Sequence, residues 1–526
     1  MQIHVLQIRV MRIFVVLLSV CFAVSLVSCE EKKKAVELTE ITMWYMPSFS
    51  DAPPPPADWE LYQKLRNQLG IKLVLIPVSP AEKERAAKIE QAVRSKSLPD
   101  IFCVSREQLA SLAKRGEITR IDRLFPLMPV RTEKMYDAEA KMAGTVDRIP
   151  YGLAHAAPVE RDSGILIRKD WLDNLNIPIP VTLDDFFDVM RRFTFLDPDG
   201  NGKHDTYGYG AYLDLSEEND GLGTQFDPFF GAFGVAGTFN MTERNAGLNI
   251  RKYSYYGALE FVSKMTAAKV IDPNWLAYHE DEFRKAWRSG KFGMMKEQFA
   301  AYSMERSYVP FDEKFPKGKW IVINPPVGPR GDKSVGTYAK RFKIYAVSRN
   351  AAEQGKLPAI ARLLEWMSTE GYNYLSYGEE NVNYRIDYKG DVTTQGLEDE
   401  NLAYTNDSFT PYLQLRDLVF YSSEKEFPFR YPTWASKNGK EISPKKVLDE
   451  MHACPWTPAF GAGNLPVATS ELRQFYENGI IDFVTGKRSL SHESWSAWLD
   501  EFDRRGGLVW ERQCISFAKE NNLLTK

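Results

Sequence analysis

Cysteine is scarce in this chain, which has five in 526 residues. Beyond Cys29 the cysteines are Cys103, Cys454 and Cys514, and they lie far apart in the sequence. This spacing matches neither the disulfide framework of a small secreted domain nor the paired ligands of a zinc site. One disulfide between them is possible, but we expect none.

The chain also lacks an excess of charge of one sign. Its 67 Lys and Arg residues nearly balance 70 Asp and Glu residues, for a formal charge of −3. A protein that binds nucleic acid usually carries a strongly basic surface, so this balance argues against a nucleic-acid partner.

Strong enzyme signatures are missing as well. The chain contains no GxSxG, HExxH or GxxxxGK[ST] motif, which would indicate a serine hydrolase, a zinc peptidase or a P-loop nucleotidase. A glycosidase needs only two carboxylates in a cleft, and the many acidic residues allow such a pair. An enzyme that acts on polysaccharide therefore stays open as an alternative.

Long apolar runs are confined to the N-terminus. Residues 13–28 are apolar, follow Arg9 and Arg12, and are too short for the roughly 20 residues of a membrane span. They fit the apolar region of a secretory signal. The sequence "LVSC" that ends the run resembles the lipobox of bacterial lipoproteins, in which Cys29 would be lipidated and become the new N-terminus. An ordinary signal peptide is the alternative, and Met11 is an alternative start.

We therefore predict a lipoprotein signal peptide at residues 1–28 and a charged tether at 29–40. A lipid on Cys29 would hold the protein on the outer face of the bacterial cytoplasmic membrane.

Strand-like and helix-like segments alternate in the mature chain, which predicts an α/β fold. Thr182 and Asp185 form a capping-box pattern at the start of the amphipathic segment "VTLDDFFDVMRRF". Further segments with clear patterns are strands at 41–46, 71–78 and 100–105, a helix at 59–70 that Gly70 ends, and a polar helix at 81–97.

The segment "DPDGNGKHDTYGYG", residues 197–210, begins like an EF-hand loop. Asp197, Asp199 and Asn201 alternate as calcium ligands do, and Gly202 stands where that loop turns sharply. The twelfth position should be Glu but is Gly208. A pair of tight turns without a metal would use the same residues.

Several motifs together resemble a known family. They are the lipobox at Cys29, "PDIFCVS", "RIPYGL", the long run from "GILIRKDWLDNLNI" through "DPDGNGKHDTYGYG", "FRKAWRSGKFGMM", "EENVNYRID" and "IIDFVTGKRSLSHESWSAWLDEFDRRGG". In this order they resemble the extracellular solute-binding proteins, family 1 type, of ABC importers. Within that family they are most similar to the large lipoproteins that capture oligosaccharides.

The resemblance implies two α/β lobes of the type II periplasmic-binding-protein fold, joined by a hinge, with ligand held in a cleft between them. The implied N-terminal lobe comprises 41–160 and 333–385, and the C-terminal lobe 161–332 and 386–526. We expect the chain to cross between lobes near 158–163, near 327–333 and soon after Tyr384.

The resemblance also implies that the half EF-hand loop holds one structural calcium ion. The ligands would be the side chains of Asp197, Asp199, Asn201 and Asp205 and the carbonyl of Lys203. Related loops often have Glu where this chain has Thr206. The Thr206 hydroxyl, a water molecule or a distant acid would then complete the shell.

A sugar site needs aromatic rings for the apolar faces of the sugar and planar polar groups for its hydroxyls. Aromatic residues make up 13% of the chain. In this fold the ligand meets loops at the carboxyl ends of strands. The candidates that follow such strands or lie in loops are Trp44, Tyr45, Ser105, Arg106, Tyr151, Trp275, Phe299, Arg341, Tyr384, Arg385 and Trp434.

Among these candidates we prefer Trp44, Trp275 and Trp434, which stand outside periodic segments, although packing in a core is the alternative for each ring. Helical periodicity assigns Trp287, Trp366, Trp495 and Trp498 to cores. Arg106, Arg341 and Arg385 could clamp the carboxylate of a uronic acid or form surface ion pairs.

The sequence therefore predicts a non-catalytic, monomeric binding lipoprotein that delivers an oligosaccharide to the permease subunits of an ABC transporter. A ligand-presenting sensor component and a peptide-binding protein are further alternatives.

Overall fold

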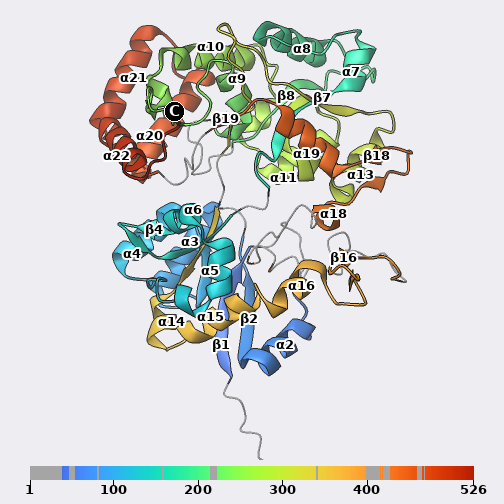
Figure 1. Cartoon of the computed structure of the whole chain (residues 1–526). Coiled ribbons are helices and arrows are strands. Elements are labelled where there is room, and N and C mark those ends of the chain that lie inside the picture. Colours follow the sequence, from blue (N-terminus) through green and yellow to red (C-terminus); the bar gives the residue numbers. More distant parts are fainter. Residues whose placement is uncertain are drawn as a thin grey trace, which may run out of the picture.

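The computed structural model describes residues 38–46, 54–79, 82–156, 159–213, 222–338, 342–397, 427–458 and 468–526, together with Leu415, Leu418, Leu465 and Pro466. Figure 1 shows two lobes, one above the other, each with a sheet and surrounding helices. The predicted two-lobed α/β fold is confirmed. Among the described helices, none combines the length and the apolar composition needed to cross a membrane.

The N-terminal lobe contains a five-stranded sheet in the order β2-β1-β3-β14-β6. Strand β1 runs parallel to β2 and β3, whereas β14 runs antiparallel to β3 and β6. The predicted strands at 41–46, 71–78 and 100–105 are confirmed. The strands are β1 (Thr39–Tyr45), β2 (Ile71–Pro77), β3 (Ile101–Val104), β6 (Gly152–Ala156) and β14 (Phe342–Val347).

Helices cover both faces of this sheet, and side chains of β1 accordingly enter cores on both sides. Ile41, Met43 and Tyr45 lie in one core, and Trp44 lies in the other. The helices of the lobe are α2 (Glu60–Leu69), α3 (Glu82–Arg94), α4 (Arg106–Arg115), η1 (Phe125–Leu127), α5 (Pro129–Met135), α6 (Ala138–Ala143), α14 (Arg349–Glu353), α15 (Leu357–Trp366) and α16 (Glu370–Tyr377). Two short strand pairs, β4–β5 (Thr145–Val146, Ile149–Pro150) and β15–β16 (Arg385–Ile386, Val392–Thr393), complete it.

Local signals set the helix ends as predicted. Gly70 ends α2 in the left-handed conformation, with φ of 66°, and its N–H donates to carbonyls of the last turn. Thr182 caps α8 (Leu183–Phe195), and the Asp185 carboxylate accepts a hydrogen bond from the Thr182 N–H.

The C-terminal lobe contains a four-stranded sheet in the order β12-β7-β11-β8. These strands are β7 (Ser163–Arg168), β8 (Tyr207–Gly210), β11 (Phe292–Gln298) and β12 (Trp320–Ile323). The longer helices are α8, α10 (Tyr253–Ala267), α11 (Glu280–Arg288), α13 (Glu305–Lys314), α19 (Pro444–Ala453), α20 (Ser470–Val484), α21 (His492–Arg504) and α22 (Gly507–Glu520). Shorter elements are α7 (Lys169–Asn174), η2 (Thr224–Phe226), α9 (Asp227–Gly231), η3 (Asn249–Arg251), η4 (Pro273–Leu276), α12 (Phe299–Ser303), α18 (Phe427–Arg430) and the pairs β9–β10 (Phe239–Asn240, Gly247–Leu248), β13–β19 (Thr337–Tyr338, Thr457–Pro458) and β17–β18 (Trp434–Ala435, Glu441–Ile442).

Across the described residues, the chain changes lobe three times. The first change lies between the end of β6 and the start of β7. The return lies between β13 and β14, because β13 still pairs with β19 of the C-terminal lobe. Leu418 packs in an N-terminal core and Phe427 in a C-terminal core, so the third crossing falls between them.

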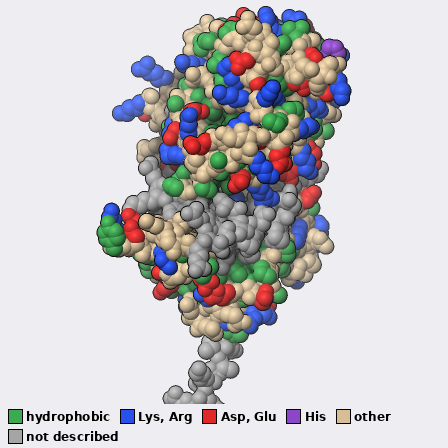
Figure 2. All heavy atoms as spheres, turned by 90° about the vertical axis from the view of Figure 1, so that its right-hand side faces the viewer, with side chains coloured by type: hydrophobic (Ala, Val, Ile, Leu, Met, Phe, Trp, Pro, Cys, Tyr) green, Lys and Arg blue, Asp and Glu red, His purple; other side chains and the backbone are tan. Residues whose placement is uncertain are grey.

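Cys103, Cys454 and Cys514 are buried, lie in both lobes and form no disulfide among the described residues. Figure 2 shows Lys, Arg, Asp and Glu side chains interspersed on both lobes of one face, in agreement with the balanced composition.

A buried histidine should make folding stability depend on pH. His155, on β6, is 2% exposed and accepts a hydrogen bond at Nε2 from Arg131 Nη2 (2.6 Å). Its proton then sits on Nδ1, which has no partner among the described residues. Burial lowers the pKa of His155 well below its ordinary value, and the charges of Arg131 and Lys343 lower it further.

In the unfolded chain the His155 imidazole would bind a proton below pH ~6.5, whereas in the folded protein it stays neutral at that pH. The contribution of His155 to the free energy of unfolding is therefore fully present above this pH. Below this pH it decreases by up to about 1.4 kcal/mol per pH unit. We expect His155→Gln to flatten the pH dependence measured by denaturant titration at mildly acidic pH. An equally steep decline in His155→Gln would assign it to other groups.

Candidate functional site

In both sheets, most strands have their carboxyl ends on the side that faces the other lobe. In the N-terminal lobe β1, β2, β3 and β6 run in one direction and end where residues 157–162 leave the sheet. In the C-terminal lobe β7 begins there, β11 and β12 run antiparallel to it, and β8 runs parallel to β11. Both lobes thus direct strand ends toward the boundary between them, as solute-binding sites in α/β folds require.

At the end of β1 the structure places both predicted aromatic residues in cores. Trp44 is 7% exposed, meets Phe102 edge to face (ring centroids 6.3 Å apart), and has Lys88 Nζ 4.9 Å from its centroid. Tyr45 is buried in the opposite core, and burial raises its pKa to about 12. Neither ring presents an open face, because helices cover both sides of this central strand.

The next candidates lie at the amino end of α4 and near β6. Ser105 caps α4, and its hydroxyl accepts from the Gln108 N–H (3.2 Å). Arg106 Nη1 donates to the carbonyl of Leu465 in the other lobe (2.7 Å). Tyr151 is half-buried and packs against the core that contains Trp44.

In the C-terminal lobe, Trp275 is a core residue. It is 2% exposed and meets Phe226 edge to face (5.1 Å), so its burial does not support its choice as a platform. Phe299 is also buried, between Phe427 (5.9 Å) and Tyr431 (4.9 Å). Trp434 is half-buried, and its Nε1 donates to the carbonyl of Ser303 (2.9 Å).

The remaining candidates belong to the N-terminal lobe or lie outside the described residues. Tyr384 is buried, which raises its pKa to about 12, and Arg385 is exposed on β15. Figure 1 shows β16, the partner of β15, on the opposite side of the lobe from α4, which carries Arg106. The carboxylate clamp by these arginines stays a prediction. Arg341 and Cys29 lie outside the described residues.

The sequence did not reveal the contacts that join the lobes. Besides the Arg106–Leu465 hydrogen bond, the Ser470 hydroxyl donates to the Glu107 carboxylate. Arg148 Nη2 lies 3.9 Å from Glu520 Oε2. These contacts connect α4 and the β4–β5 pair with α20 and α22, so the lobes touch on this side of the molecule.

Buried charges at the end of β11 were missed as well. Lys296 Nζ donates to the Thr224 carbonyl (2.9 Å) and lies 3.8 Å from Asp227 Oδ2. Glu297, which is 3% exposed, accepts two hydrogen bonds of 3.2 Å from Arg284. Burial alone would lower the pKa of Arg284, but Glu297 and Glu280 outweigh it and raise that pKa. The sequence did contain an indication of these buried charges, because the charged run "KEQ" ends an otherwise apolar strand.

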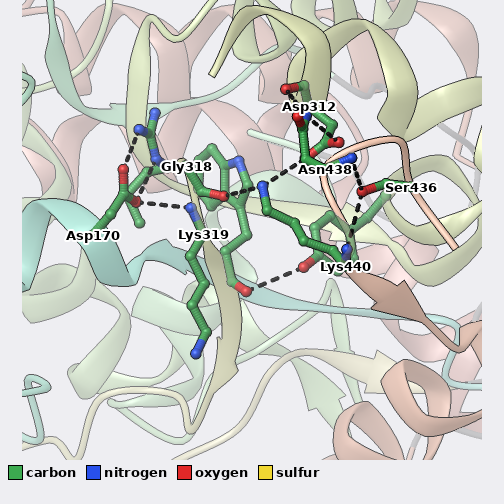
Figure 3. Close-up of polar contacts among 10 residues, drawn as sticks. Asp170, Asp312, Gly318, Lys319, Ser436, Asn438 and Lys440 are labelled. Atoms are coloured by element: carbon green, nitrogen blue, oxygen red, sulfur yellow. Dashed lines mark hydrogen bonds and ion pairs between the residues drawn. The ribbon is translucent and has the colours of Figure 1, made fainter. Parts of the chain in front are cut away.

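A polar network fixes the β17–β18 hairpin, which carries Trp434, to α13 (Figure 3). Lys440 Nζ donates to Asp312 Oδ1 (2.5 Å) and to the Gly318 carbonyl (2.8 Å), and Asn438 Nδ2 donates to Asp312 Oδ2 (2.8 Å). Burial tends to raise the pKa of Asp312, yet hydrogen bonds from Lys440, Asn438 and Ser436 lower it overall. The network thus ties the hairpin that carries Trp434 to α13.

The half EF-hand loop follows α8 on the C-terminal lobe. Asn201 Nδ2 donates to Asp199 Oδ2 (2.9 Å) and Asp205 Oδ1 (3.2 Å), and Asp197 Oδ2 accepts from the Gly202 N–H (2.9 Å). Burial, followed by the neighbouring carboxylates, raises the pKa of Asp199. Asp199 and Asp205 thus share one side-chain amide, whereas Asp197 accepts from the loop backbone. A cation bound among these carboxylates would relieve their repulsion.

The Thr206 hydroxyl is not available to complete a calcium shell. Thr206 is buried, and its hydroxyl donates to the Phe193 carbonyl of α8 (2.8 Å). Within the described ranges, no three His, Cys, Asp or Glu side chains are arranged as a metal site. The oxygen-rich donor set nevertheless matches the preference of calcium.

No model of a protein family matches the chain. It is 26% identical over 249 residues to the polygalacturonan/rhamnogalacturonan-binding protein YtcQ of Bacillus subtilis (strain 168), over 46% of each chain. It is 24% identical over 251 residues to lipoprotein LipO of the same organism, over 47% of this chain and 49% of LipO. The chain thus matches about half the length of these curated relatives.

Solved structures match over most of the chain. The substrate-binding protein FusA of an S. pneumoniae ABC transporter, in complex with kestose, has a TM-score of 0.65 at 16% identity. The match covers 92% of this chain and all of FusA. Another structure of FusA is of an EF-hand mutant. The chain therefore has the two-lobed fold of solute-binding proteins, and about half of it is similar in sequence to a polygalacturonan/rhamnogalacturonan-binding protein.

Proposed function

We propose that the protein captures an oligosaccharide between its lobes and delivers it to the permease subunits of an ABC transporter. The observation that carries this proposal is the convergence of strand carboxyl ends from both sheets on one boundary, which the chain crosses three times. When two lobes close about such crossings they enclose a ligand, and when they open they release it.

The substrate class follows from the relatives. YtcQ binds polygalacturonan and rhamnogalacturonan, and FusA was solved with kestose. Chains of sugar residues are common to both, whereas acidic groups are not. We therefore assign an oligosaccharide and leave its charge to experiment.

A glycan array of acidic and neutral oligosaccharides, followed by calorimetry on the hits, tests this function. We expect saturable binding with one site per chain and recovery of the glycan unchanged. Hydrolysis of the glycan would favour a polysaccharide-active enzyme. Binding of peptides without binding of any glycan would contradict the substrate class.

We further propose that the half EF-hand loop binds one structural calcium ion through Asp197, Asp199, Asn201, Asp205 and the Lys203 carbonyl. Calcium that binds only the folded protein should raise stability by about 2.7 kcal/mol at a free concentration 100-fold above Kd. We expect a chelator to lower the Tm of the wild type but not of Asp197→Asn/Asp199→Asn.

The control is Asp500→Ala, an exposed acid on α21, which should respond to calcium like the wild type. An unchanged melting curve after chelation of the wild type would contradict the calcium site.

We also propose Cys29 as the site of lipid attachment, with the protein held as a monomer on the outer face of the cytoplasmic membrane. The lipobox-like sequence before Cys29 and the similarity to lipoprotein LipO support this assignment.

A further inference from the structure

Trp456 differs from the other tryptophans in its surroundings. The others contribute to the apolar cores of the two lobes, either as buried members or packed against them. Trp456 belongs to none of the cores formed by the described residues and is half-buried. A large ring outside a core loses burial energy, so its position calls for another explanation.

The backbone around Trp456 is fixed by a ladder to the segment that leads into the return crossing. The Val335 N–H donates to the Pro455 carbonyl, and the Thr457 N–H donates to the Gly336 carbonyl, both at 2.9 Å. These bonds lie on either side of Trp456 and continue into the parallel pair β13–β19. The backbone that carries the Trp456 ring is therefore fixed by hydrogen bonds on both sides.

The indole is held as well. Its Nε1 donates to the carbonyl of Met451, at the end of α19 (3.1 Å). This bond satisfies the polar atom and restrains the ring plane while the half-buried side chain keeps accessible surface. An aromatic ring held in this way binds an apolar surface at little cost in conformational entropy.

A second ring and a cation lie on the neighbouring segments. Tyr338, on β13, is half-buried, and the Arg161 guanidinium lies 5.4 Å from its ring centroid. Arg161 belongs to the first crossing, where the Glu160 carbonyl accepts a hydrogen bond from His452 Nε2 of α19 (2.8 Å). These contacts connect the first crossing with α19 and with β13, which leads into the return crossing.

We propose that Trp456, which directly precedes strand β19 paired with the strand of Tyr338, is an aromatic platform on which one sugar ring of the bound oligosaccharide stacks. This inference rests on the proposed oligosaccharide-binding function. The apolar C–H face of a pyranose or furanose ring lies against the indole, and Arg161, which lies over the Tyr338 ring, donates hydrogen bonds to sugar oxygens. The platform lies next to the segment that leads into the return crossing.

The test uses trigalacturonate and kestose as probes, with calorimetry on the wild type, Trp456→Ala, Trp456→Phe and Tyr253→Ala. We expect Trp456→Ala to weaken binding of the bound probe by about 10- to 100-fold, the range expected for loss of a stacked ring. Trp456→Phe should retain most of the affinity, and Tyr253→Ala, an exposed ring far from the crossings in sequence, all of it. All four proteins should melt at similar temperatures.

A second readout separates stacking from a structural role. Ligand should quench or shift tryptophan fluorescence of the wild type, and Trp456→Phe should lose most of that change while still binding. Normal affinity of Trp456→Ala for a probe that the wild type binds would overturn the platform and leave the proposed function intact. If the wild type binds neither probe nor any glycan of the array, the proposed function fails and the platform with it.

Discussion

Replacing Trp495 by alanine is expected to lower the free energy of unfolding by about 3–5 kcal/mol, the usual cost of removing a buried Trp. Trp495, on α21, stacks on Trp498 (5.0 Å between centroids) and on Tyr255 of α10 (6.0 Å), and it meets Phe483 of α20. Its loss would leave a cavity where three helices meet. Denaturant titration measures the effect.

The matched control is Tyr253→Ala, two residues before Tyr255 on the same helix. Tyr253 is 88% exposed, so its removal should change stability by no more than about 0.5 kcal/mol. The folded fraction of Trp495→Ala should bind glycan with unchanged affinity. A loss of affinity without a loss of stability would place Trp495 in the binding site instead.

The second large effect concerns the buried carboxylate at the end of β11. Arg284→Met should destabilise the protein by about 3–5 kcal/mol, because it leaves the Glu297 charge buried without its bidentate partner. In Arg284→Met/Glu297→Gln the uncompensated charge is gone, and we expect most of the lost stability to return.

An exposed ion pair provides the control for this cycle. Arg349 and Glu353 pair on α14 with more than half of each side chain exposed, so Arg349→Met should cost less than about 1 kcal/mol. A double variant as unstable as Arg284→Met would show that lost packing, rather than buried charge, causes the effect.

Local patterns in the sequence predicted much of the fold. The strands at 41–46 and 71–78, the cap at Thr182 and the helix stop at Gly70 depend on neighbouring residues and appear as expected. The later crossings depend on pairing between distant segments. Thr337 and Thr457 pair although they are 120 positions apart in sequence. No local pattern predicts that β13 belongs to the C-terminal lobe.

The same reason limits the candidate site. Trp44 and Trp275 lack periodic neighbours, so the sequence could not show that Phe102 and Phe226, from other elements, pack against them. Trp456, between two prolines in "CPWTP", resembled an ordinary loop residue. Its ladder to residues 335–337 becomes visible only in three dimensions.

The most direct test of the account is small-angle X-ray scattering of the mature protein with and without an oligosaccharide found on the array. Capture between lobes predicts that saturating glycan lowers the radius of gyration and that the glycan is recovered intact afterwards. A protein that binds the glycan at one site per chain while its scattering curve stays the same would contradict capture by lobe closure.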